Sequence, residues 1–364
     1  MPTKNGPESQ HNHSQVNGLI SRYFVIMNGN LLNPGLILGL GLLAGGVQLP
    51  DASAGDQTPA TESKTLPKAA KWAFVLQSDK LSSSADVAAA RLAASDRDVI
   101  VMDFSFDGSL ANKWSPRQIQ EIRSGSKSGP RKVLAYLSIG EAEDYRHYWQ
   151  EDWDPEHDGT TDAGAPLFLL SENPHWSGNY KVRFWHPEWQ SLVLKYLDII
   201  QNQGFDGIYL DIVDGFEFFE KDPDSDTFHD NKTNPETGNS YRRDMIQWVS
   251  RLASIARQKK PGFLIVPQNG FQLLEHPEYR KVISGIGIED LYTDGHQLQS
   301  QDSIRYKMHF LSQATADDIP VFVIDYSGDF LQQARSIQKA RKLPASILFT
   351  DRPLTTLGRA FAFP

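Results

Sequence analysis

The sequence predicts an α/β fold, a (β/α)8 TIM barrel, and three observations carry this prediction. Eight short apolar runs rich in Val, Ile, Leu and Phe recur between residues 72 and 351. Most of these runs are continuously apolar, which is typical of parallel strands covered on both faces. Helical patterns separate the runs, and eight strands with helices between them in about 290 residues match the usual size of a TIM barrel. A doubly wound open sheet is the structural alternative, although no GxGxxG follows the first strand.

The elements follow one another in a regular order. Pro187 in a first turn and Gly204 after a last turn mark the ends of one long expected helix. No long helix is expected after the eighth strand. The expected strands are residues 72–77, 98–104, 132–138, 207–211, 263–268, 285–290, 321–326 and 346–351, and the expected helices are residues 84–95, 115–124, 187–203, 241–260, 271–282, 300–315 and 330–341.

The first residues of the chain differ in composition from the barrel. Residues 31–49 are apolar and Gly-rich but are interrupted by Pro34, and the small residues 52–54 that follow resemble a cleavage site. We therefore expect a cleaved leader and a secreted or periplasmic protein without a stable membrane span, an uncleaved anchor being the alternative. The expected organisation is a leader at 1–54, a linker at 55–70 and a catalytic domain at 71–364.

Charge and cysteine content exclude several classes of function. The 364 residues include 36 Lys and Arg against 45 Asp and Glu, a net charge of −9. This balance argues against nucleic acid as a partner, since phosphate binding requires basic patches. The chain has no cysteine, which excludes disulfides, thiolate metal sites and a cysteine nucleophile. The histidines form no HExxH pattern, so we expect no metal site and no cofactor.

Polar and acidic residues end most of the expected strands, on the face of a TIM barrel where catalytic groups gather. An acid at a strand end is often only a helix cap or a turn residue, but its recurrence at most strands favours a site. Crowded carboxylates raise one another's pKa, which suits proton transfer. The residues at these ends are Asp103, Glu141, Asp211, Gln268, Asn269, Glu289, Asp325 and Asp351.

Asp211 and Glu289 are the candidate catalytic pair. They end the fourth and sixth strands, and side chains at one height in a barrel come from alternate strands. Two facing carboxylates are the usual catalytic groups of glycoside hydrolases, so Asp211 becomes the candidate nucleophile and Glu289 the candidate acid/base. Asp214, three residues further along the loop, is expected to bind substrate. Asp206 precedes the strand and is expected to be structural.

A long insertion after the third strand, residues 139–186, is rich in aromatic side chains. Flat rings with polar edges suit the C–H faces of sugars, although such rings could instead fix a long loop to the barrel. Together with the strand-end residues, this leads to a predicted substrate-binding set of Asp103, Glu141, Tyr145, Trp149, Trp185, Asp214, Gln268, Asn269 and Asp325.

Three segments together resemble glycoside hydrolase family 114, whose members are similar to endo-α-1,4-polygalactosaminidases and include a bacterial branch labelled cysteinyl-tRNA synthetase-related. The segments are LAYLSIGEAEDYRHYW at 134–149, NYKVRFWHPEWQ at 179–190 and GFDGIYLDIVD at 204–214. The resemblance implies a (β/α)8 barrel that cleaves α-1,4-linked galactosamine polymers with retention. It places the family's catalytic Asp at Asp211 and its catalytic Glu at Glu289, beside Asp290. Ile212 departs from the family, because the fungal members have a polar residue there.

Two further hypotheses stay open from the sequence. The same carboxylate pair could act on a different polysaccharide. Alternatively, the barrel could be catalytically silent and bind polysaccharide through its Trp-rich loop alone.

Overall fold

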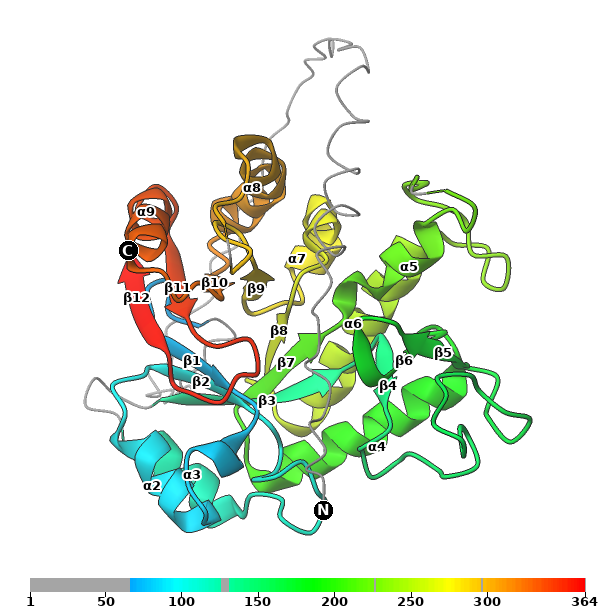
Figure 1. Ribbon diagram of the computed structural model, residues 1–364, viewed down its shortest axis with the longest axis horizontal. Coiled ribbons are helices and arrows are strands. Elements are labelled where there is room, and N and C mark those ends of the chain that lie inside the picture. The colour runs from blue at the N-terminus through cyan, green and yellow to red at the C-terminus, as the bar shows by residue number, and fades with distance from the viewer. Residues whose placement is uncertain (1–65, 126–130, 226, 296, 364) are drawn as a thin grey trace, which may run out of the picture.

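The computed structural model describes residues 66–125, 131–225, 227–295 and 297–363. Eight parallel strands occupy its centre, with the helices around them (Figure 1). The strands are β1 (Trp72–Val75), β2 (Val99–Met102), β3 (Lys132–Ser138), β7 (Gly207–Asp211), β8 (Leu264–Pro267), β9 (Ile286–Glu289), β10 (Val321–Asp325) and β11 (Ala345–Phe349). All eight coincide with the expected apolar runs, and the α/β barrel class is confirmed.

The strands form two parallel arcs. The first pairs β1, β2, β3, β7 and β8 in that order, and the second pairs β9, β10 and β11. A parallel bridge between Gln268 and Gly287 joins the arcs, and the Asn269 N–H donates to the Gly287 carbonyl at 2.9 Å. At the other seam, the N–H groups of Leu76 and Gln77 donate to the carbonyl of Leu354. Every strand therefore ends on the same face, where the loops meet.

A twelfth strand, β12 (Arg359–Phe363), pairs antiparallel with β11 along its whole length. The sequence prediction that no long helix follows the last barrel strand is therefore correct, but the strand in its place was not predicted. Its sequence RAFAF is apolar at four of five positions, but its side chains are exposed or only half-buried.

The helices follow the expected pattern with one exception. Those that cover the barrel are α2 (Ala85–Ala94), α3 (Pro116–Ser124), α4 (Pro187–Gln203), α6 (Tyr241–Lys259), α8 (Gln301–Ala316) and α9 (Phe330–Ala340). The single helix expected at 271–282 is wrong: a 3-10 turn η4 (Phe271–Glu275) and a one-turn helix α7 (Pro277–Arg280) stand there instead. Pro277 causes the break, because it has no N–H to donate and fits only a first turn.

The barrel interior is filled by large side chains. Trp72, Phe74, Tyr136 and Tyr209 lie inside the ring and are nearly inaccessible to solvent. A Cβ added to Gly287 would lie 1.9 Å from the Tyr209 hydroxyl oxygen, so only glycine fits opposite that ring. This packed interior leaves the ends of the strands as the place for a ligand.

The lower end of the barrel is closed by the residues before β1. Leu66 is buried in the inner cluster, and the Ala70 N–H donates to the Ser346 hydroxyl at 2.9 Å. Residues 66–70 of the expected linker thus pack against the barrel. Asp206 lies at this end as well, where it accepts hydrogen bonds from Val133 N and Arg123 Nε at 3.0 and 3.1 Å.

The insertion after β3 folds as a small antiparallel sheet of β4 (Glu141–Glu143), β6 (Trp176–Val182) and β5 (Leu169–Asn173), in that order. Its aromatic residues build a core of their own. Trp153, Phe168 and Tyr180 are buried with Trp189 of α4, and the Trp189 Nε1–H donates to the Ile139 carbonyl. Most of the aromatic cluster therefore fixes the insertion to the barrel, which was the alternative interpretation of the sequence.

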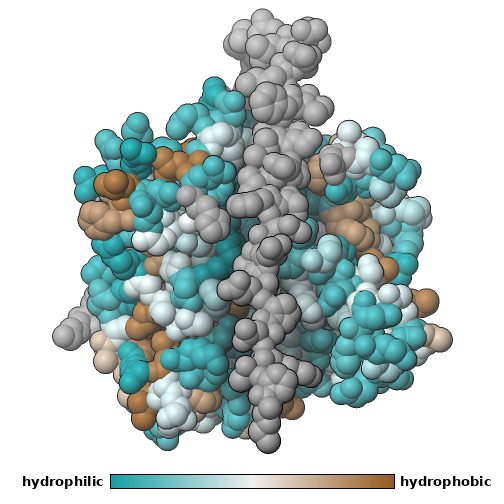
Figure 2. Space-filling view, in the orientation of Figure 1, coloured by the Kyte–Doolittle hydropathy of each residue, from teal (hydrophilic) through white to brown (hydrophobic). Residues whose placement is uncertain are grey.

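The expected leader at 1–54 and most of the expected linker lie outside the described residues. Among the helices within those residues, none is both long and apolar enough to cross a bilayer. The face of the molecule seen in Figure 2 is largely hydrophilic, with hydrophobic residues scattered in small groups.

Candidate active site

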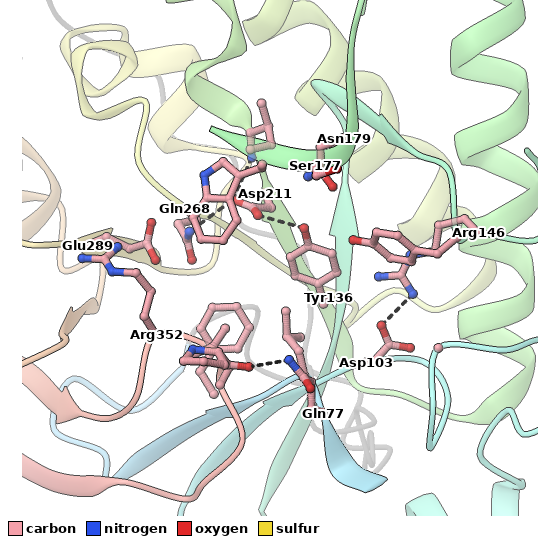
Figure 3. A pocket seen from close by; sticks show the side chains of 18 of the residues that line it. Gln77, Asp103, Tyr136, Arg146, Ser177, Asn179, Asp211, Gln268, Glu289 and Arg352 are labelled. Carbon is pink, nitrogen blue, oxygen red and sulfur yellow. Dashed lines mark hydrogen bonds and ion pairs between the residues drawn. The ribbon is translucent and has the colours of Figure 1, made fainter. Parts of the chain in front are cut away.

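A pocket of about 670 Å³ lies where the barrel strands end. Asp211 at the end of β7 and Glu289 at the end of β9 both line it, with Gln268 after β8 between them (Figure 3). Tyr136 of β3, Arg146 of the insertion and Arg352 after β11 are also labelled in its wall. The pocket thus collects side chains from nearly the whole circumference of the barrel.

Asp211 is held by donors on both carboxylate oxygens. Oδ1 accepts from the Ile212 N–H at 2.9 Å and from Gln268 Nε2 at 3.1 Å, and Oδ2 accepts from the Tyr136 hydroxyl at 2.9 Å. Burial raises the pKa of Asp211 to about 6, and the hydrogen bonds from Ile212 and Tyr136 oppose that rise. The carboxylate is therefore fixed in one orientation and is anionic at neutral pH.

The pKa of Glu289 is raised as well. Burial, followed by the charges of Asp211 and Asp290, raises its pKa to about 7. The Tyr326 hydroxyl donates to Oε1, while Oε2 lies 3.4 Å from Asn269 Nδ2. Because the charge of Asp211 contributes to this shift, the two carboxyls influence each other across one pocket, and Glu289 keeps its proton at a pH where Asp211 has lost one.

The backbone is strained where three neighbouring strands reach the pocket. Ile212, Asn269 and Asp290 follow β7, β8 and β9, and their φ angles are 54°, 56° and 49°. Asparagine and aspartate tolerate this left-handed conformation, whereas a β-branched residue rarely adopts it. The departure from the family pattern noted at Ile212 thus falls where a polar residue such as asparagine would fit with less strain.

Gly140 supports this strained turn from the neighbouring loop. A Cβ at this position would lie 2.2 Å from the Ile212 carbonyl oxygen. We expect Gly140→Ala to push the 211–212 backbone away, lowering the free energy of unfolding by about 1–3 kcal/mol and reducing kcat. Thermal unfolding and initial rates test this.

Gly328→Ala serves as the matched control for Gly140→Ala, because a Cβ there meets nothing within 4 Å. Equal behaviour of the two variants would contradict the role given to Gly140.

Asp103 lines the pocket, but its carboxylate is held in an ion-pair network. Arg146 lies 2.6 Å from both Asp103 Oδ2 and Glu143 Oε2, and all three side chains are buried. The Tyr136 oxygen lies 3.1 Å from Glu143 Oε1 as well as 2.9 Å from Asp211. The network therefore fixes Tyr136, and Tyr136 in turn orients Asp211.

Asp214 has fewer hydrogen-bond and ion-pair partners than the other carboxyls that line the pocket. It lines the pocket, and its side chain accepts no hydrogen bond from another described residue. Burial and then the charges of Glu217, Asp211 and Glu289 raise its pKa well above the ordinary value. Such a group is available to an incoming ligand.

The structure divides the predicted substrate-binding residues into two sets. Asp103, Tyr145, Asp214, Gln268 and Asn269 line the pocket, whereas Glu141, Trp149, Trp185 and Asp325 do not. The second set has structural partners, which are described next.

Each residue of the second set is held away from the pocket by its own contacts. Trp149 packs on Tyr180 of the insertion, and Trp185 packs on Phe219 and donates to Glu236. Glu141 accepts from Asn173 and Asn179, and the buried Asp325 accepts from the Tyr292 N–H.

Several residues of the pocket wall were not predicted from the sequence. Tyr136 and Tyr326 lie in or next to apolar strands and appear as core residues in the pattern. Arg352 lies over the Tyr326 ring at 4.1 Å and pairs with Asp290 at 2.9 Å. Trp176 was part of the aromatic cluster but was not singled out; it is 49% exposed and lines the pocket.

The sequence that builds this site matches a known protein family. The family model described as glycoside-hydrolase family GH114 matches residues 53–361, which include every strand of the barrel. The chain belongs to glycoside hydrolase family GH114. The resemblance inferred from three short segments is thereby confirmed over most of the chain, and the enzyme class of this GH114 protein is glycoside hydrolase.

Two relatives of this GH114 protein match about two thirds or more of the chain. An uncharacterized protein of Methanocaldococcus jannaschii is 34% identical over 262 residues, 71% of this chain and 66% of its own length. An uncharacterized protein of Deinococcus radiodurans is 32% identical over 246 residues, 67% of this chain and 69% of the relative. The chain thus spans about two thirds of the length of these relatives.

Solved structures share the fold. The glycoside hydrolase domain of PelA from Pseudomonas aeruginosa matches with a TM-score of 0.55 and 18% identity, covering 79% of this chain and 96% of that domain. Aspergillus fumigatus Ega3, solved in complex with galactosamine, matches with a TM-score of 0.53 and 18% identity over 85% of this chain and 98% of Ega3. At this level of identity the likeness is one of fold.

Proposed function

We propose that this GH114 protein hydrolyses an α-1,4-linked galactosamine polymer, with Asp211 as nucleophile and Glu289 as acid/base. One observation carries the proposal: two carboxyls of different pKa, from strands two barrel positions apart, line one pocket. The family supports the reaction class, and the galactosamine bound to Ega3 supports the sugar.

The reaction proceeds with retention in two displacements. In the first step, Asp211 attacks the anomeric carbon while protonated Glu289 gives its proton to the leaving oxygen. In the second step, deprotonated Glu289 takes a proton from water as that water breaks the glycosyl ester. Esterification removes the charge of Asp211, which had raised the pKa of Glu289, so Glu289 becomes a stronger acid when it has to give up its proton. NMR of the first-formed anomer tests retention.

Asp214 is the proposed receptor for the substrate amino group. An amino sugar is cationic. Its ammonium group only donates hydrogen bonds and therefore needs an acceptor, which a carboxylate supplies. Asp103 is neutralised by Arg146, whereas the carboxyl of Asp214 has no partner among the described residues. Binding of the ammonium group favours the charged form of Asp214, so a proton leaves as the substrate enters.

The pH profile of kcat/KM is expected to be bell-shaped with its maximum between about 6 and about 7. Below a pH of about 6 Asp211 becomes protonated and cannot attack, and above about 7 Glu289 loses the proton that it must donate. Initial rates across pH 4 to 9 check this expectation. A rate that rises steadily through pH 8 would contradict the roles given to the pair.

Export of the protein through a cleaved leader is part of the proposal. The family match begins at residue 53, within the small residues 52–54 that end the expected leader. Sequencing the N-terminus of the protein recovered outside producing cells tests it: a mature end near residue 55 supports cleavage, and an intact Met1 contradicts it.

A panel of polysaccharides with reducing ends measured over time separates the functional hypotheses. The panel holds partly deacetylated α-1,4-galactosaminan, its fully acetylated form, chitosan and a neutral glucan. Cleavage of the deacetylated galactosaminan alone supports the proposal. Cleavage of another polymer identifies a different substrate, and binding without cleavage of any member favours a silent barrel.

A further inference from the structure

A second hollow of about 280 Å³ lies beside the catalytic pocket. It is formed by residues 108–110 of the loop after β2 and by six residues at the start of the insertion, which are Asp144, Tyr145, Arg146, His147, Trp149 and Glu151. Gly108, Tyr145 and Arg146 line both hollows, so the two are adjacent and share the Tyr145 side chain as a wall. Ligand pockets usually have volumes of about 300 to 1,000 Å³, so this hollow lies near the lower end of that range, which suits a single sugar ring.

Tyr145 is an exposed aromatic ring that is nevertheless held in place. Its side chain is 55% exposed, yet its hydroxyl donates to Glu143 Oε1 at 2.7 Å and its ring lies 5.0 Å from the Arg146 guanidinium. Arg146 is itself fixed between Asp103 and Glu143. A ring fixed in this way loses little conformational entropy when a sugar stacks on it, which favours binding.

Two carboxyls that have no hydrogen-bond or ion-pair partner among the described side chains line the hollow. They belong to Asp144 and Glu151. The charge of Arg146 is balanced by Asp103 and Glu143, and burial and then Arg146 lower the pKa of His147, so its ring is neutral at neutral pH. An aromatic ring and two carboxylates that line the same hollow match a cationic sugar.

We propose that this hollow is a subsite for one further amino-sugar unit of the chain whose scissile bond lies in the catalytic pocket. The inference rests on the proposed function. Tyr145 stacks on the sugar face, and Asp144 and Glu151 accept the ammonium group. A polymer then occupies both hollows at once, and the second contributes only when the chain is long enough to reach it.

The test compares α-1,4-galactosamine oligomers of increasing length on Asp144→Asn/Glu151→Gln. We expect kcat/KM to fall about three- to tenfold for the longest oligomers, given the usual strength of exposed charge pairs. The shortest oligomer that the unaltered enzyme cleaves should react at an unchanged rate. Asp152→Asn is the matched control, because Asp152 is an exposed acid next to Glu151 that does not line the hollow.

Three outcomes would overturn the subsite: an equal loss at every chain length, a loss no larger than that of Asp152→Asn, or an equal loss on fully N-acetylated oligomers. Glu151→Gln alone, at an exposed position, gives the same comparison if the double variant unfolds. If the unaltered enzyme cleaves none of the oligomers, the proposed function fails. Their binding to Glu289→Gln, with and without the two substitutions, still decides the subsite.

Discussion

Asp211→Asn is expected to abolish hydrolysis, with kcat falling on the order of 10⁴- to 10⁶-fold, as when the nucleophile is removed from a cooperating catalytic unit. The amide has the shape of the carboxyl, so its oxygen can still accept from Ile212 and Gln268. Tyr136 can turn its hydrogen toward Glu143, which lies 3.1 Å away. The pocket therefore stays assembled, and the loss reflects the missing nucleophile. Reducing ends released from deacetylated galactosaminan measure it.

Asp206→Asn is the matched control for Asp211→Asn, because Asp206 lies one residue before the same strand at the opposite end of the barrel. It accepts from Val133 N and Arg123 Nε and faces Lys260 Nζ at 3.6 Å. Weakening these buried bonds is expected to cost about 1–3 kcal/mol of stability, measured by urea unfolding, with kcat of the folded protein unchanged. A substantial residual rate in Asp211→Asn, at normal stability, would remove the nucleophile role.

The acids at the strand ends were predictable because of where they stand in the pattern. A carboxylate directly after a continuous apolar run must emerge where the strand leaves the core, since an unpaired charge is not tolerated inside it. This reasoning located Asp211 and Glu289 from the sequence, and both line the pocket. It could not separate them from Asp325, which also ends a strand but accepts from the Tyr292 N–H and remains buried.

The rest of the site was hidden because its residues have a second role. Tyr136 lies within an apolar strand and packs in the barrel core. The sequence pattern therefore shows only a core residue and does not reveal that its hydroxyl donates to Asp211. Arg352 reaches the site through Asp290, a contact 62 residues away in sequence. Conversely, Trp149 and Trp185 were predicted to bind sugar from composition alone, and neither lines the catalytic pocket. Both are half-buried against other aromatic rings, Trp149 on Tyr180 and Trp185 on Phe219, and no local pattern encodes these pairings.

Glu289→Gln is expected to lower kcat on polysaccharide by about 10²- to 10⁴-fold, the usual contribution of a general acid. Glutamine can still accept from the Tyr326 hydroxyl, so the side chain keeps its place while losing the proton that it delivers. The loss should shrink on an aryl glycoside whose leaving group needs no proton. Added azide should restore turnover and give the glycosyl azide of retained configuration, because the ester on Asp211 still forms but lacks its base.

Asp290→Asn separates this effect from a general change of charge. Asp290 adjoins Glu289, and asparagine tolerates its left-handed φ of 49°, but its carboxylate is paired with Arg352 instead of facing the substrate. Its charge helps to raise the pKa of Glu289, so its removal should shift the basic limb of the pH profile to lower pH while kcat at the optimum changes little. The opposite pattern, with Asp290→Asn inactive and rescued by azide and Glu289→Gln active, would transfer the acid/base role to Asp290. The sequence alone left open whether Glu289 or the adjacent Asp290 carries the reacting proton, and the comparison of these two variants decides it.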